Sequence, residues 1–117
     1  MNVVRNGTAP VNVANSPLFE GLVHSSPLIP ADDSHIGVSL VSFTDGARNK
    51  FHTHTADQIL YITEGEGIVA SRDQEHRVVA GDIVHVPPGE VHWHGAAPGC
   101  AMAHLSILPP STTTIVE

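Results

Sequence analysis

The sequence predicts a single all-β domain, built as an antiparallel sandwich or barrel. A chain of 117 residues, 41% of them hydrophobic, is long enough for one core and too short for a second. From residue 36 onward, short β-rich runs are separated by polar turn signals containing Gly, Pro or Asp. No window of about a dozen residues keeps the 3.6-residue period of a helix without a Gly or Pro inside it. Evenly spaced short strands of this kind favour antiparallel pairing.

The elements follow in order along the chain. Residues 1–35 contain Pro10, Pro17, Pro27 and Pro30, so we expect an extended arm or edge strands there. Residues 36–108 carry the strand pattern, and residues 109–117 form a tail that ends as an edge strand or as a loose or partner-bound segment. The breaks include Glu64-Gly65-Glu66-Gly67, which separates two predicted strands. The predicted strands are residues 36–43, 51–53, 58–63, 68–71, 77–79, 83–86, 91–94 and 101–108.

Charge and cysteine content narrow the function classes. Twelve acidic residues against five Lys and Arg give a net charge of -7, which repels phosphate backbones and argues against a nucleic-acid partner. Cys100 is the single cysteine, so neither an internal disulfide nor a cysteine zinc cluster can form. The sequence has no signal-like or membrane-spanning apolar run. We therefore expect a cytoplasmic protein that does not bind membranes.

Nine histidines are the unusual feature of the composition. Side chains two residues apart on a strand share a face and lie roughly 6.5–7 Å apart, so His52 pairs with His54 and His92 with His94. Gln58 opens the next strand and adds an amide oxygen. Imidazole and oxygen ligands suit divalent Mn, Fe, Ni, Cu or Zn and exclude an all-oxygen calcium site.

The spacing around these histidines resembles the two motifs of the cupin superfamily. The first runs from Gly46 through His52-Thr53-His54 and Gln58 to Gly65, and the second from Gly81 through Pro87-Pro88-Gly89 to His92. This resemblance implies a single-domain cupin: a double-stranded β-helix, or jelly roll, forming a six- to eight-stranded antiparallel barrel over residues 36–108. It also implies four metal ligands, which are His52, His54, Gln58 and His92.

Two positions depart from the family pattern. Gln58 stands where the family usually has Glu, and Ala96 where it usually has Asn. An amide leaves the full +2 charge of the cation in place, which disfavours oxidation to the trivalent state and strengthens Lewis acidity toward a bound oxygen. Gln58 therefore favours polarisation of a hydroxyl or carbonyl over activation of dioxygen.

A narrower resemblance covers His92-Trp93-His94-Gly95-Ala96-Ala97-Pro98 and Ala101-Met102-Ala103-His104-Leu105. These segments are similar to small bacterial cupins that include manganese-dependent hydroxynitrile lyases, often labelled carboxymuconolactone-decarboxylase-like cupins. The resemblance implies Mn²⁺ as the cofactor, with Fe²⁺, Zn²⁺ or Ni²⁺ as alternatives. It makes His94 and His104 candidate catalytic bases, because an imidazole titrates near working pH. Strand alternation then predicts a substrate pocket lined by Ser39, Val41, Phe43, Leu60, Met102 and Leu108.

The sequence thus predicts a metal-dependent enzyme that acts on a small molecule, with a hydroxynitrile lyase-type carbon–carbon lyase as the first hypothesis. The alternatives are a metal cupin isomerase or dioxygenase acting on a sugar-like or ketoacid substrate, and a non-catalytic cupin that binds a metal or small molecule. Small cupins commonly pair through their sheets, so we also expect a homodimer or homotetramer.

Overall fold

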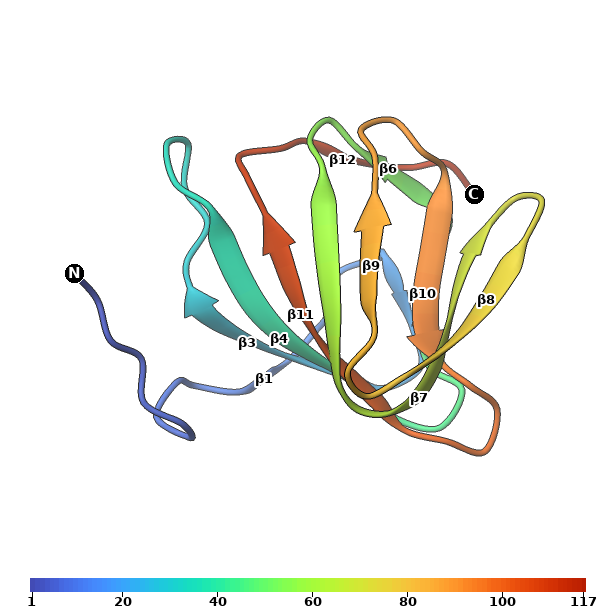
Figure 1. Ribbon diagram of the computed structural model, residues 1–117, viewed down its shortest axis with the longest axis horizontal. Coiled ribbons are helices and arrows are strands. Elements are labelled where there is room, and N and C mark those ends of the chain that lie inside the picture. The colour runs from blue at the N-terminus through green and yellow to red at the C-terminus, as the bar shows by residue number, and fades with distance from the viewer.

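A computed structural model describes all 117 residues and shows an all-β protein (Figure 1). Five of the twelve strands have only two or three residues, and the other seven have four or more. No helix has the length and hydropathy needed to cross a lipid bilayer. The strands are β1 (Asn12–Val13), β2 (Phe19–Glu20), β3 (Val23–Ile29), β4 (Gly37–Phe43), β5 (Arg48–Asn49), β6 (His52–His54), β7 (Gln58–Ser71), β8 (Glu75–Val79), β9 (Ile83–Val86), β10 (His92–Ala96), β11 (Met102–Leu108) and β12 (Thr113–Ile115).

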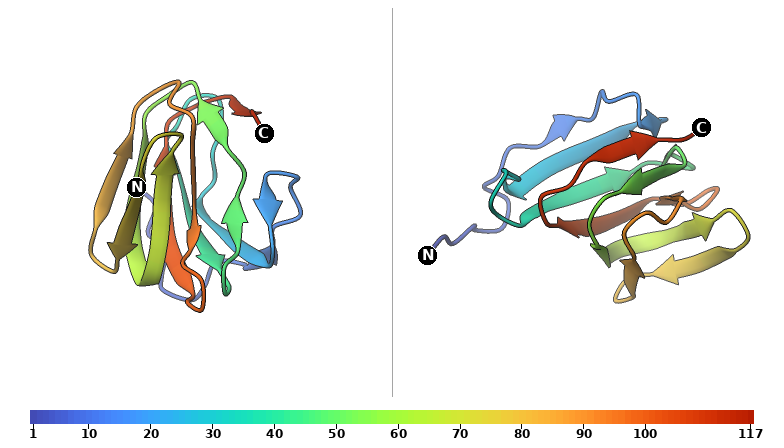
Figure 2. Two further views of the ribbon diagram at one scale, coloured as in Figure 1. Left: turned by 90° about the vertical axis from the view of Figure 1, so that its right-hand side faces the viewer. Right: turned by 90° about the horizontal axis from the view of Figure 1, so that it is seen from above.

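The strands form one curled antiparallel sheet that closes part of the way into a barrel (Figure 2). Its main path runs β1-β3-β4-β11-β7-β10-β5-β2, with β8 and β9 on β7 and with β6 between β10 and β12. Every pairing is antiparallel, so the predicted all-β antiparallel fold is confirmed.

The predicted break at residues 64–67 is wrong, because β7 runs through it as one strand of 14 residues. Its first half pairs with β11 and β9 and its second half with β10 and β8, so β7 joins the two halves of the barrel. β7 bends at Gly65 between these two halves, and the φ angle of Gly65 is 74°. A Cβ at this position would lie 1.9 Å from the carbonyl oxygen of Ala101, so only glycine fits.

The two ends of the chain pair with opposite parts of the sheet. β3 pairs with β1 and β4, and its register shifts after Pro27, which cannot donate a backbone hydrogen bond. At the other end, β12 pairs with β6, so Thr113 lies opposite His54 and Ile115 opposite His52. The C-terminal segment therefore lies directly against the strand that carries the first two histidines.

The barrel interior changes from apolar to polar along the inward face of β4. Phe43 and Val41 belong to the hydrophobic core, and the next inward position is Ser39. On β11 the cross-strand neighbours are Met102 for Phe43 and His104 for Val41. The hydrophobic core therefore packs at the C-terminal end of β4, and the histidines lie nearer the N-terminal end of this strand. It contains Val23, Val41, Phe43, Ala47, Leu60, Ile62, Val69, Val78, Ala96 and Met102.

Candidate metal centre

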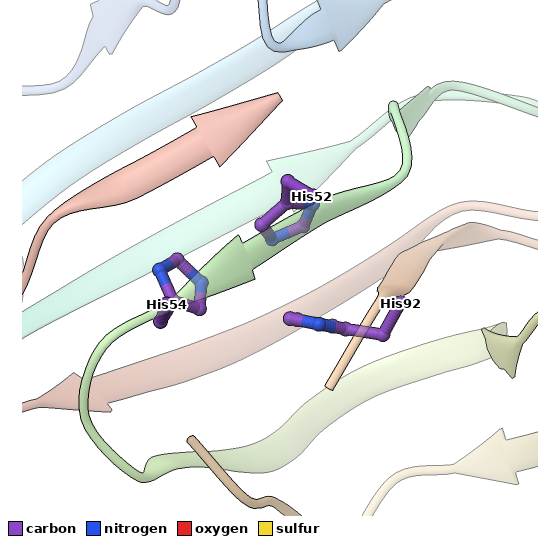
Figure 3. Close-up of side chains that lie close together, drawn as sticks. All are labelled: His52, His54 and His92. Carbon is purple, nitrogen blue, oxygen red and sulfur yellow. The ribbon is translucent and has the colours of Figure 1, made fainter. Parts of the chain in front are cut away.

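Three buried histidines converge inside the barrel (Figure 3). His52 and His54 project from the same face of β6, and His92 at the start of β10 lies directly opposite His52. One ring nitrogen from each residue lies within 4.8 Å of the other two. The ring centroids of His52 and His92 are 4.2 Å apart, and those of His52 and His54 are 4.8 Å apart. Strand alternation and one cross-strand pair are thus enough to build the cluster.

Each of the three rings is held through its Nδ1 atom, which leaves Nε2 free to face the centre. For His52 and His92 the partner is a carbonyl oxygen, which can only accept, so the proton lies on Nδ1 and the lone pair on Nε2. The hydroxyl partner of His54 is able to accept from Nδ1 in the same way. This is the arrangement by which proteins orient imidazole ligands toward a metal. The Nδ1 partners are the carbonyl oxygen of Lys50 for His52 at 2.6 Å, the carbonyl oxygen of Glu90 for His92 at 2.9 Å, and Oγ1 of Thr113 for His54 at 2.8 Å.

Burial keeps the cluster in the neutral form that a metal ligand requires. It lowers the pKa of His52 to about 4. Burial, together with the nearby His92, lowers the pKa of His54 to about 4 as well, and burial also lowers the pKa of His92. All three imidazoles are therefore uncharged at neutral pH, and each has one nitrogen lone pair available to bind a cation.

Gln58 brings an oxygen to the same centre. Its amide nitrogen donates to Oγ of Ser106 at 2.9 Å, which turns Oε1 inward to a point 3.2 Å from Nε2 of His92. Nδ1 of His92 donates its proton to the carbonyl oxygen of Glu90, so Nε2 of His92 is an acceptor. This Nε2 and Oε1 of Gln58 are therefore two acceptors that face each other. Nε2 of His54 is also buried without a hydrogen-bond partner. A cation satisfies all of these lone pairs at once, and the donor set therefore fits a divalent transition metal.

A second pair of histidines lies beside the cluster. Nδ1 of His94 is 2.9 Å from Nε2 of His104, and both residues are buried. Burial and the neighbouring His104 hold the pKa of His94 well below its usual value, and burial lowers the pKa of His104 to about 4. Nδ1 of His104 has no partner. The His94 ring lies 5.7 Å from that of His52, so the pair adjoins the candidate metal site.

Asn49 fixes the position of His94. Its side-chain oxygen accepts from the backbone N–H of His94 at 2.8 Å, and its amide nitrogen lies 3.2 Å from Nε2 of the same ring. Asn49 lies on β5, which pairs with β10 and β2. One buried amide therefore contacts both the backbone and the ring of a candidate base.

His52 and His54 of the cluster share a cavity of about 200 Å³ with His94 and His104. Of the predicted pocket residues, Ser39, Val41 and Leu108 line it. Phe43, Leu60 and Met102 face the interior but belong to the packed core, and Phe43 reaches the site only through its ring contacts with His94 and His104. His92 does not line the cavity. The lining consists of Leu18, Phe19, Ser25, Ser39, Val41, Asn49, His52, His54, Gln58, His94, His104, Ser106 and Leu108.

Sequence reasoning missed several of these residues. Leu18, Phe19 and Ser25 come from the proline-rich N-terminal region, which carries no motif. Asn49 lies between Gly46 and His52 of the first motif but belongs to a separate two-residue strand, so the alternation that identifies His52 and His54 does not reach it. No local signal in the sequence distinguishes these residues from ordinary loop positions.

A family profile and several known proteins are similar to this chain in sequence. The sequence profile described as Cupin domain matches residues 39–107. The (R)-mandelonitrile lyase of Granulicella tundricola is 39% identical over 110 residues, which cover 92% of this chain and 83% of that enzyme. An acireductone dioxygenase of Gluconobacter oxydans is 27% identical over 111 residues, covering 89% of this chain but only 58% of that enzyme.

Solved structures agree with the sequence matches. A cupin-like protein from Thermotoga maritima superposes with a TM-score of 0.84 at 32% identity, over 89% of this chain and 83% of that protein. The resemblance of the two sequence motifs to cupins is therefore confirmed, and so is the β-barrel fold that this resemblance implies.

Proposed function

Because the chain belongs to the cupin family and its interior holds a buried three-histidine cluster, we propose that it is a Mn²⁺-dependent hydroxynitrile lyase, which cleaves or forms cyanohydrins. The observation that carries this proposal is that three of the four candidate ligands, His52, His54 and Gln58, share one cavity with the His94–His104 pair. The 39% identity to an (R)-mandelonitrile lyase supports the same reaction.

The cluster defines what the site offers to a substrate oxygen. A divalent cation, when bound, supplies Lewis-acid polarisation of a hydroxyl or carbonyl oxygen. His52, His54, His92 and Gln58 are all neutral donors, so the ligand set does not offset the charge of the cation. These four donors would hold the ion and leave coordination positions open to substrate or water.

The chain itself supplies the base. In the cleavage direction the hydroxyl of the cyanohydrin gives its proton to the His94–His104 pair, and the carbon–carbon bond then breaks to release an aldehyde and cyanide. In the hydrogen bond between Nδ1 of His94 and Nε2 of His104, one nitrogen donates and the other accepts. A proton taken up by one ring can therefore be passed on to the other ring. After proton uptake the pair is positively charged and stabilises the departing cyanide.

The lining of the cavity favours an uncharged substrate. Neither Lys nor Arg lines it, while Leu18, Val41 and Leu108 offer apolar contacts. A second hollow of about 280 Å³ shares Ser39, Ser106 and Leu108 with this cavity and is lined by Asp32 and Asp33. Carboxylates at this position repel ketoacids and uronates, which argues against the isomerase alternative.

The dioxygenase alternative has one observation in its favour, the 27% identity to an acireductone dioxygenase. The neutral Gln58 opposes it, because a carboxylate ligand stabilises the trivalent state that oxygen activation requires. Oxygen uptake with a diketone substrate measures this activity directly. A non-catalytic binding role leaves the buried His94–His104 pair without a purpose.

We expect the Mn²⁺-loaded protein to release benzaldehyde from (R)-mandelonitrile faster than the uncatalysed background. The reason is that polarisation of the hydroxyl oxygen and removal of its proton are both available in one cavity. Benzaldehyde is measured by its ultraviolet absorbance at acidic pH, where spontaneous breakdown is slow. Protein stripped with EDTA is the control, and equal rates for loaded and stripped protein would rule out the lyase proposal.

We expect Asn49→Ala to lower kcat about ten- to hundredfold with little change in KM, because a displaced catalytic group costs about that much. Metal content, measured by elemental analysis, should stay at the wild-type level, since Asn49 contacts His94 and none of the ligand nitrogens. Ser26→Ala is the matched control, because Ser26 is also buried but bonds the carbonyl of Pro10 outside the site. Equal losses of activity in both variants would show a general effect on stability.

A further inference from the structure

The strand that carries His52 and His54 receives most of its pairing from one neighbour. β6 pairs with β10 at a single position, where His52 lies opposite His92, and the carbonyl oxygen of His54 accepts from the N–H of Gly89 at 2.8 Å. On its other side, β12 pairs with all three residues of β6 and runs alongside it (Figures 1 and 2). The order of β6 therefore depends mainly on the C-terminal segment that contains β12.

This contact continues beyond both ends of β6. After the strand, the N–H of Thr55 donates to the carbonyl oxygen of Thr112 at 3.2 Å, and the N–H of Thr112 donates to Oγ1 of Thr55 at 2.9 Å. Before the strand, the carbonyl oxygen of Phe51 accepts from the N–H of Val116 at 2.9 Å, and the N–H of Phe51 donates to the carboxylate of Glu117 at 2.6 Å. Hydrogen bonds from the C-terminal segment thus hold the metal-ligand strand and the residue on each side of it.

One side chain of this segment reaches a candidate ligand directly. His52 and His92 are oriented locally, since Nδ1 of each ring bonds the carbonyl oxygen two residues earlier in the chain. His54 instead depends on Oγ1 of Thr113, which lies 2.8 Å from its Nδ1 and 59 residues further along. If Thr113 withdrew, Nδ1 of His54 would lose this acceptor, and the ring proton would be free to occupy Nε2. A proton on Nε2 blocks the atom that binds a metal.

Hydrogen bonds, and not burial, attach the segment to the barrel. All three residues of β12 are exposed, and the apolar side chains of Ile115 and Val116 each remain 37% exposed. The hydrophobic core lies in other strands and contains no residue of this segment. Elements with few buried apolar contacts open at a small cost in free energy. The segment can therefore detach from β6 while the core stays folded.

We propose that residues 112–117 form a clamp that sets the metal affinity of the site, with Thr113 as the positioning residue for His54. When the clamp is docked, it orders β6 and keeps Nε2 of His54 directed at the centre before a cation arrives. Coupling of this kind is reciprocal, so a bound cation in turn holds the clamp on β6. The inference rests on the proposed metal centre and is independent of the reaction that the site catalyses.

Three substitutions on β12 test the role of the Thr113 hydroxyl. Thr113→Val keeps the shape of the side chain and removes the acceptor, so we expect it to weaken Mn²⁺ binding about 10- to 100-fold. Thr113→Ser keeps the hydroxyl and should restore wild-type affinity. Thr114→Val is the matched control, because Thr114 is the next residue on the same exposed strand and its side chain points to the opposite face. Metal-free protein is titrated with Mn²⁺, and the electron paramagnetic resonance signal of the free ion gives the dissociation constant.

Deletion of residues 112–117 tests the ordering of β6 without any metal. The N–H of Gly89 donates to His54 and makes no contact with the clamp, so its hydrogen exchange reports only on β6. In metal-free protein we expect this amide to exchange about tenfold faster after the deletion, because β6 then opens more often. Amides in the centre of β11 should keep their wild-type rates, which shows that the barrel is still folded. In the full chain, Mn²⁺ should slow exchange within residues 112–117.

The possible outcomes separate the clamp from the metal centre. A wild-type protein that binds no Mn²⁺ would overturn both. A wild-type protein that binds Mn²⁺ with the same affinity as Thr113→Val would overturn the positioning role of Thr113 and leave the metal centre intact. An unchanged exchange rate at Gly89 after the deletion would overturn the ordering of β6 by the clamp, whatever the metal affinity.

Discussion

His52→Ala is expected to abolish metal binding, leaving less than a tenth of the metal that the wild-type protein retains after gel filtration. The substitution removes one of three convergent imidazoles, and His54, His92 and Gln58 without it cannot hold the ion in the same geometry. Loss of a group that merely orients a ligand costs about 10- to 100-fold in metal affinity, so loss of the ligand itself should cost more. Elemental analysis of protein loaded with Mn²⁺ measures the result directly.

Thermal unfolding gives a second readout of the same prediction. A metal present at 100 times its dissociation constant stabilises the folded state by about 2.7 kcal/mol. EDTA should therefore lower the Tm of the wild-type protein and leave that of His52→Ala unchanged. His76→Ala is the control, because His76 is exposed on β8 and lies outside the cluster. Wild-type metal content in His52→Ala would exclude the cluster as the binding site.

The part of this site that follows from the sequence is the part built by local periodicity. Alternation alone places His52 and His54 on one face of a strand, and it also gives the correct inward set on β4. The prediction that Gln58 and His92 join His52 and His54 depends on the motif resemblance. These residues come together only because β6, β7 and β10 are neighbours in the sheet. Periodicity within one strand does not specify which strands become neighbours.

The features that the sequence does not predict depend on contacts between distant segments. Thr113 holds His54 from 59 residues away, and Asn49 holds His94 from 45 residues away. The continuity of β7 was missed for a related reason. A run of two glycines and two glutamates is typical of a turn, but here Gly65 passes close to Ala101 and the strand continues into the other half of the barrel. Tertiary packing overrides the local turn preference at this point.

His104→Gln tests the catalytic pair without touching the metal ligands. We expect kcat for mandelonitrile cleavage to fall on the order of 10²- to 10⁴-fold, the range for loss of a general base. His104 contacts His94 and Phe43, and it has no ring contact with His52, His54 or His92. Metal content should therefore remain at the wild-type level, which separates this variant from His52→Ala.

The double variant decides whether the two histidines act as one unit. If His94 and His104 transfer a single proton between them across their 2.9 Å contact, removing either one breaks the path, and removing both adds little. The losses in kcat for His94→Gln, His104→Gln and the double variant should then be similar. Multiplicative losses would instead indicate two independent roles. A His104→Gln enzyme that keeps its metal and loses less than about fivefold in kcat would exclude His104 from proton transfer, because even a weak general base contributes more than that.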